Sequence, residues 1–231
     1  MKVLAVACLY PLPADFGSAV RVLDTMRALA SQHDVRILCG SRHGDPGEEA
    51  RQLSAAVDAP TEVFAGARLG ERFLPVRWMR SMLTMTPTWV GASLSPGLAK
   101  RLAALAPSYE RIVLLDDYAA AYLDVTRGSS TVPPVVMDKH NVLGASHARP
   151  AETDRLSLRA RLDLRLVRSF ERRAVNRAST VVVTSKDEAE RLTKLYAGPS
   201  PAVVPSGVDL PAEAWKPPGT RNIVCVANFN Y

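Results

Sequence analysis

Residues 2–39, KVLAVACLYPLPADFGSAVRVLDTMRALASQHDVRILC, predict the fold class. Two apolar runs in this stretch, Lys2–Cys8 and Asp34–Cys39, have the length and composition of buried strands. The region between them has helical spacing over Ser18–Ser31, where the apolar side chains fall on one stripe. The order strand, helix, strand is typical of a parallel sheet covered by helices.

The same alternation continues along the chain. Five further apolar runs are rich in Val, Ile and Leu without strict alternation, which is typical of strands covered on both faces. They are Thr61–Phe64, Arg111–Leu115, Val135–Asp138, Thr180–Thr184 and Ala202–Val204. The sequence therefore predicts an α/β domain, a Rossmann-like parallel sheet with helices on both faces.

Helix starts are marked by side chains that can accept backbone hydrogen bonds. Ser18 is the expected N-cap of the first helix. Ser185-Lys-Asp-Glu188 predicts a capping box that opens a helix over Lys186–Tyr196. A longer helix is expected from about Glu152 to Ala178. Its inner side carries Leu158, Leu162, Leu166, Phe170 and Ala174.

Four arginines, at steps of four, three and four, form one basic ridge on the long helix. They are Arg161, Arg165, Arg168 and Arg172. A solvated helix face is the favoured interpretation, with contact to anionic lipid or an acidic acceptor as the alternative.

Residues 66–96 combine Pro and Gly with apolar bulk such as Trp78, Met82 and Trp89. Two interpretations stay open for them, a mobile hydrophobic acceptor loop and a partly packed helical excursion.

Composition narrows the function classes. The chain has 231 residues, 47% of them apolar, so one full domain plus a remnant is expected, and no apolar run is long enough to span a membrane. The net charge of +6 indicates an anionic partner, such as a sugar nucleotide or a phospholipid surface. Nucleic acid ranks low because no aromatic residues interleave the basic ones. Three widely spaced cysteines, Cys8, Cys39 and Cys225, indicate reduced thiols and a cytoplasmic location.

The loop after the first strand, Leu9–Gly17, leads directly into a helix. Small residues there allow a close approach of a ligand, and the exposed N–H groups of a helix start favour phosphate. The loop lacks the GxGxxG pattern and the second strand ends in Leu38-Cys39-Gly40 rather than an acid, so a nicotinamide-dependent oxidoreductase is disfavoured. A plain turn between strand and helix is the simpler interpretation of this loop alone.

Several segments in order resemble family 4 glycosyltransferases. Gly17-Ser-Ala-Val-Arg21-Val22 and His33-Asp-Val-Arg-Ile-Leu38 are similar to the opening of that family, with Ser18 where the second Gly of a pair usually stands. Asp138-Lys-His140-Asn141 resembles the loop where the family places a His facing the acceptor and the reacting sugar. Later matches are Glu171–Ser185, Pro205-Ser-Gly-Val-Asp209 and Asn222–Tyr231.

This resemblance implies the two-lobed GT-B fold. Residues 1–209 would form the N-terminal, acceptor-side Rossmann-like domain, residues 210–220 an interdomain linker, and residues 221–231 the first strand of a missing C-terminal donor-binding domain. The implied reaction transfers a sugar from a nucleotide donor to a hydroxyl of a glycan, lipid or small molecule, with retention of configuration. It needs no metal or other cofactor. Residues 1–231 alone are expected to be inactive, because the family holds the donor mainly in the second lobe.

The resemblance also implies site residues. His140 is the expected catalytic residue, Gly17, Ser18 and Arg21 are expected near the donor diphosphate, and Asp138 and Asn141 are loop partners of His140; no metal site is expected. Asp116 and Asp117 also face the expected cleft, although capping of the following helix is the favoured interpretation.

Two other classes stay open: a non-catalytic module that binds an acceptor or a membrane, and a GT-B-like sugar-nucleotide epimerase. Beside the cytoplasmic location, peripheral contact with the inner face of an anionic membrane stays open.

Overall fold

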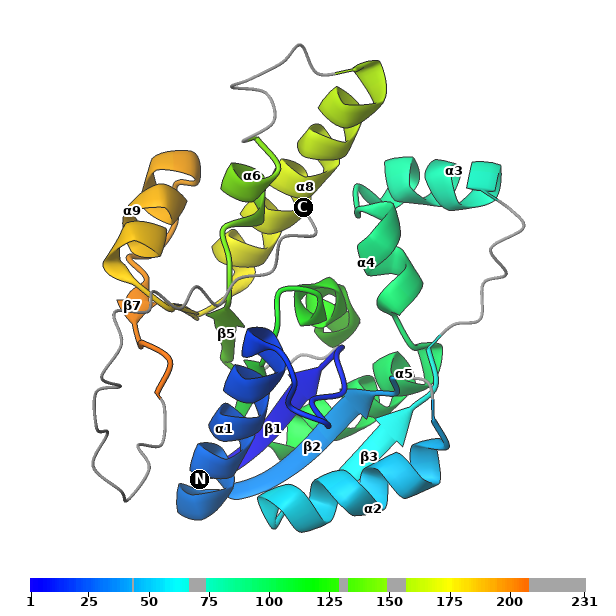
Figure 1. The fold of residues 1–231 in the computed structure, drawn as a ribbon, viewed down its shortest axis with the longest axis vertical. Helices are drawn as coiled ribbons and strands as arrows, with labels where there is room; N and C mark the ends of the chain where they lie inside the picture. The colour runs from blue at the N-terminus through cyan, green and yellow to red at the C-terminus, as the bar shows by residue number, and fades with distance from the viewer. Residues whose placement is uncertain (43, 67–73, 129–132, 149–156, 208–231) are drawn as a thin grey trace, which may run out of the picture.

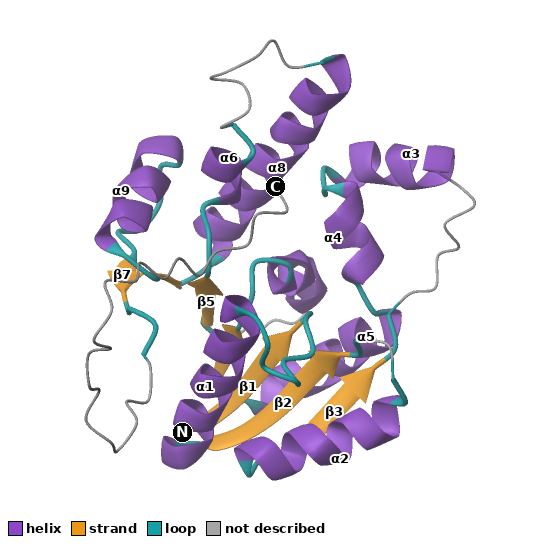
Figure 2. Cartoon of the chain, viewed as in Figure 1, coloured by secondary structure: helices purple, strands orange, loops and turns teal. Residues whose placement is uncertain are grey.

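The computed structural model describes residues 1–42, 44–66, 74–128, 133–148 and 157–207. Within these residues one sheet of parallel strands runs in the order β3-β2-β1-β4-β5-β6-β7 (Figures 1 and 2). The strands are β1 (Lys2–Ala7), β2 (Asp34–Gly40), β3 (Thr61–Phe64), β4 (Arg111–Leu114), β5 (Val135–Lys139), β6 (Thr180–Val183) and β7 (Ala202–Val203). The predicted parallel sheet is confirmed, and each of the seven strands predicted between residues 2 and 204 ends within one residue of an observed one.

Helices cover both faces of this sheet (Figure 1). Successive side chains of a strand point to opposite faces, so Leu4 and Val6 of β1 pack in one apolar cluster and Val3 and Ala5 in the other. The first cluster is closed by α5, η2 and α8, and the second by α1 and α2. The helices are α1 (Gly17–Gln32), α2 (Pro46–Val57), α3 (Leu74–Thr84), α4 (Thr88–Ser93), α5 (Pro96–Leu105), α6 (Leu143–Ser146), α8 (Leu158–Arg177) and α9 (Lys186–Leu195), with 3-10 turns η1 (Ala106–Ser108) and η2 (Ala119–Gly128).

The N-terminal caps of two helices, α1 and α9, differ from the predicted ones. Helix α1 begins one residue early, with Phe16 as an extended N-cap that makes no side-chain hydrogen bond, so the prediction that Ser18 caps it is wrong. Ser18 lies inside the first turn, where its backbone is already helical. Ser185 caps α9 as predicted, but the carboxylate of Glu188 accepts from Val142 N rather than closing the box, because the loop after β5 lies beside it.

Most of the described part of the segment between β3 and α5 is helical, as α3 and α4, which favours the partly packed helical excursion over the loop. In α8 the four ridge arginines are exposed as predicted, and Leu166, Phe170 and Ala174 are buried. Leu158 is instead 76% exposed, because it opens the helix beyond the packed part. Residues 152–156, the linker 210–220 and the strand expected at 221–231 lie outside the described residues.

Glycine is required where β2 passes the end of β1. A Cβ at Gly40 would overlap the carbonyl oxygen of Cys8, a backbone atom that cannot move aside cheaply. Gly40→Ala is therefore expected to destabilise the protein by about 1–3 kcal/mol, the range for overpacking. Urea denaturation checks this, with Gly66→Ala as the control, because a Cβ at Gly66 meets nothing within 4 Å. Equal stability of the two variants would contradict the close approach.

Candidate functional site

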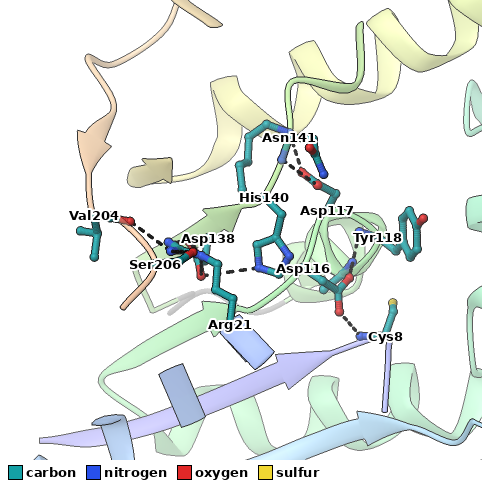
Figure 3. Close-up of polar contacts among 12 residues, drawn as sticks. Cys8, Arg21, Asp116, Asp117, Tyr118, Asp138, His140, Asn141, Val204 and Ser206 are labelled. Atoms are coloured by element: carbon teal, nitrogen blue, oxygen red, sulfur yellow. Dashed lines mark hydrogen bonds and ion pairs between the residues drawn. The ribbon is translucent and has the colours of Figure 1, made fainter. Parts of the chain in front are cut away.

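A pocket of about 610 Å³ opens at the carboxyl edge of the sheet, between the start of α1, the end of β5 and the segment after β7. Gly17, Ser18, Arg21, His140 and Asn141 all line it. Five residues that the sequence analysis selected from two distant segments are thus brought to one place. The sixth, Asp138, is buried beside the pocket and contacts Arg21 (Figure 3).

The start of α1 presents free backbone donors to this pocket. The first helical bond in its cap runs from Val20 N to Phe16 O, and the amides of Gly17, Ser18 and Ala19 form no hydrogen bond with another described residue. The first turn carries no acidic side chain, and a Cβ at Gly17 would meet nothing within 4 Å. An uncapped helix start carries about half a positive charge. This end of the pocket is therefore suited to an anion.

His140 contributes the opposite wall. Its side chain is only 6% exposed, and its Nε2 is a buried polar atom with no hydrogen-bond partner among the described residues. The nearest carboxylate oxygen, Asp138 Oδ2, lies 3.7 Å away, beyond hydrogen-bonding distance (Figure 3). Leaving such an atom unpaired costs free energy. A polar group that reached this atom would remove that cost.

Arg21 is committed to the protein itself. Its Nη2 lies 2.6 Å from Asp138 Oδ1, its Nε donates to the same carboxylate, and its Nη1 donates to Val204 O and Ser206 Oγ. Burial acts to raise the pKa of Asp138, but the nearby His140 and the hydrogen bonds and charge of Arg21 outweigh it, and the pKa is lowered. The Arg21 charge is therefore balanced, and the side chain ties the segment after β7 to α1. Direct contact of Arg21 with a substrate stays a prediction.

Asp116 is a structural cap, as favoured from the sequence. Its carboxylate accepts from the backbone of Cys8 and Leu9 on one side and from Tyr118 and Ala119 on the other (Figure 3). Burial raises its pKa, while these N–H donors act in the opposite direction. Asp116 thereby joins the loop that leads to α1 to the loop after β4.

A buried ionic cluster beneath His140 was missed by the sequence analysis. The ammonium of Lys139, 1% exposed, lies 2.7 Å from Asp117 Oδ1 and 2.7 Å from Glu171 Oε1. Burial alone would lower the pKa of Lys139, but the two carboxylates raise it. Burial would raise the pKa of Glu171, but Lys139 lowers it. One signal in the sequence indicated that Glu171 is buried. It stands four residues after the apolar Val167 and therefore shares the buried side of α8 with it.

Carboxylates from this region also hold the backbone of the loop that carries His140. Asp117 accepts from Asn141 N at 3.3 Å and Glu188 from Val142 N at 2.8 Å. Glu171 accepts from the amides of Leu143 and Gly144, each at 2.8 Å, and from the hydroxyl of Tyr196. Four consecutive amides are thus fixed by acids from three other elements. This anchoring sets where His140 lies.

The described residues contain no group of three or more His, Cys, Asp and Glu side chains arranged to hold an ion. No helix within them is long and apolar enough to cross a membrane. Cys8 and Cys39 are buried free thiols, in line with the reduced state expected for them.

The sequence matches the family model described as Glycosyltransferase Family 4 over residues 17–211. Among solved structures, HepE from Anabaena, crystallised with UDP and glucose, is similar with a TM-score of 0.55 and 17% identity, over 90% of this chain and 45% of that chain. A UDP-glucosyltransferase from Polygonum tinctorium matches with a TM-score of 0.49 and 12% identity, over 91% of this chain and 53% of that one. The chain thus spans about half the length of these proteins. No curated protein matches.

Proposed function

This chain belongs to Glycosyltransferase Family 4, and we propose that it forms the acceptor-side lobe of a retaining glycosyltransferase. The proposed reaction moves a sugar from a nucleotide donor to a hydroxyl of a glycan, lipid or small molecule. One observation carries the proposal: Gly17 and Ser18 of the uncapped start of α1 line the same pocket as His140, whose Nε2 has no partner among the described residues. The pocket volume, about 610 Å³, lies in the range of small-molecule sites.

We assign the diphosphate of the donor to the amides of Gly17, Ser18 and Ala19. Negative charge grows on the departing diphosphate as the sugar leaves, and fixed donors aimed at that charge lower the barrier. The dipole of a helix with 16 residues supplies such a field without a mobile cation. The UDP and glucose in the HepE structure support a sugar nucleotide as the donor.

We assign His140 to the reacting sugar or the acceptor hydroxyl. A neutral imidazole can form a hydrogen bond with a hydroxyl without bringing a fixed charge to the site. Asp138, whose pKa is lowered, stays ionised beside it and holds Arg21, while Asn141 lies at the pocket with its amide bound by Asp117. In this proposal Asp138 and Arg21 hold the pocket wall in place, and contact of Arg21 with the donor diphosphate stays a prediction.

Titration of the ¹⁵N-labelled chain with UDP-glucose and UDP, followed by NMR, tests the proposal. The amides of residues 17–19 and the imidazole of His140 are expected to shift along one saturation curve, because one ligand contacts both walls. The same shifts are expected in EDTA, since the proposed site needs no metal. Uridine without phosphates serves as the control and should leave residues 17–19 unchanged. Shifts confined to other regions of the chain would contradict the assignment of the diphosphate and of His140 to this pocket.

A further inference from the structure

The carboxylate of Glu171 contacts the chain on both sides of His140. Before His140, Glu171 Oε1 lies 2.7 Å from the ammonium of Lys139. After it, Oε1 accepts from Leu143 N and Oε2 accepts from Gly144 N, each at 2.8 Å. One buried side chain of α8 thus fixes both ends of the short stretch that carries His140.

Helix α9 holds Glu171 in turn. Tyr196, the C-cap of α9, is 5% exposed, and its hydroxyl donates to Glu171 Oε2 at 2.7 Å. Together with Lys139, Leu143 and Gly144, this hydroxyl gives the carboxylate four donors within the described residues. Rotation of the carboxylate would leave buried polar groups unpaired, which costs free energy. Glu171 is therefore held in one orientation.

Position 144 has room only for glycine. A Cβ at Gly144 would lie 2.3 Å from the hydroxyl oxygen of Tyr196 and 3.0 Å from Glu171 Oε2. The side chain of Tyr196 is buried, so its hydroxyl could move away only by breaking its hydrogen bond with Glu171. The positions of Tyr196, Glu171 and the loop after His140 therefore depend on one another.

We propose that Glu171 is a positioning residue, which sets with Gly144 and Tyr196 where the His140 imidazole lies at the pocket. Nε2 of His140 has no hydrogen-bond partner among the described residues, so the ring depends on the backbone that carries it. Displacing a reacting group by about 1 Å can lower a rate roughly 100-fold. The consequence for sugar transfer rests on the proposed function, in which His140 contacts the reacting sugar or the acceptor hydroxyl.

NMR signals of the His140 imidazole, assigned by their loss in His140→Gln, test the proposal in the ligand-free chain. Glu171→Gln keeps the size of the side chain but replaces one acceptor oxygen by an NH2 group, which cannot accept from a backbone amide. The His140 signals are expected to shift. UDP-glucose should bind about two- to ten-fold more weakly, the range for one hydrogen bond. Binding of UDP should change little, because UDP lacks the glucose that His140 would contact, whereas general destabilisation would weaken both ligands equally.

Two further variants complete the test. Tyr196→Phe removes one hydroxyl and no charge, so it should keep the fold even if Glu171→Gln does not, and it should shift the His140 signals by less. Glu62→Gln is the control, because it makes the same chemical change at a carboxylate that binds Arg101, and it should leave those signals in place.

Unmoved His140 signals in both Glu171→Gln and Tyr196→Phe, or equal shifts in Glu62→Gln, would overturn the positioning role. If the signals shift as expected but UDP-glucose does not bind to the wild type, the proposed function fails and the placement of His140 by Glu171 stands.

Discussion

Replacing Lys139 by Met is expected to lower the free energy of unfolding by about 3–5 kcal/mol, the range for removing one partner of a buried ion pair. The substitution keeps the volume of the side chain and removes the cation that lies 2.7 Å from both Asp117 and Glu171. Two carboxylates would then stay buried without a compensating charge, which is costly in a medium of low dielectric constant. Urea denaturation followed by circular dichroism measures the effect.

Two further variants separate the charge effect from packing. Adding Asp117→Asn and Glu171→Gln to Lys139→Met should recover part of the loss, because no unpaired charge remains. Arg101→Met breaks the partly exposed pair with Glu62 and is expected to change stability far less, since water screens that pair. If Arg101→Met were as damaging as Lys139→Met, burial would not be the reason that the Lys139 cluster matters.

The same cluster predicts how stability depends on pH. The pKa of Glu171 is lowered in the folded state, so its contribution is present above its ordinary value of 4.5 and is lost as pH falls through the folded value. The pKa of Lys139 is raised, so its contribution is present below 10.5 and is lost as pH rises through the folded value. Urea midpoints should therefore fall in acid for the wild type. For Lys139→Met they should rise, because protonation then relieves the buried carboxylates.

Placing a carboxylate at the start of α1, in Gly17→Asp, is expected to weaken binding of UDP by at least about ten-fold, or 1.4 kcal/mol. The new charge would occupy the end of the helix that we assign to the diphosphate. A Cβ at Gly17 has open space around it, so the fold should tolerate the change. An acid in the first turn should even stabilise the helix by about 0.3–1 kcal/mol. Binding and stability should thus change in opposite directions.

Gly17→Asn is the matched control, because it has nearly the same size and no charge. Calorimetric titration with UDP should give an affinity for this variant within about three-fold of the wild type. Thermal unfolding should give a higher midpoint temperature for Gly17→Asp than for Gly17→Asn. Equal affinity of the Asp and Asn variants would contradict an anion site at the start of α1.

Much of the fold could be predicted because its signals are local. Buried strands such as β1 and β2 appear as apolar runs, and the ridge of α8 follows from the helical period. Helix ends were less predictable. Ser18 has the right chemistry for a cap, yet α1 starts at Gly17, because the extended backbone at Phe16 sets the boundary. The exposure of Leu158 likewise depends on where α8 leaves the packed layer.

The sequence by itself determined the strands, three of the helices and the segments that resemble a known family, since each depends on residues close along the chain. Only the tertiary structure decided what those residues do for one another. Arg21 and Asp138 are 117 positions apart, and Cys8 and Asp116 are 108 apart, so no local pattern could pair them. Crossovers of the sheet bring these side chains to one edge, and burial there makes their pairing energetically necessary.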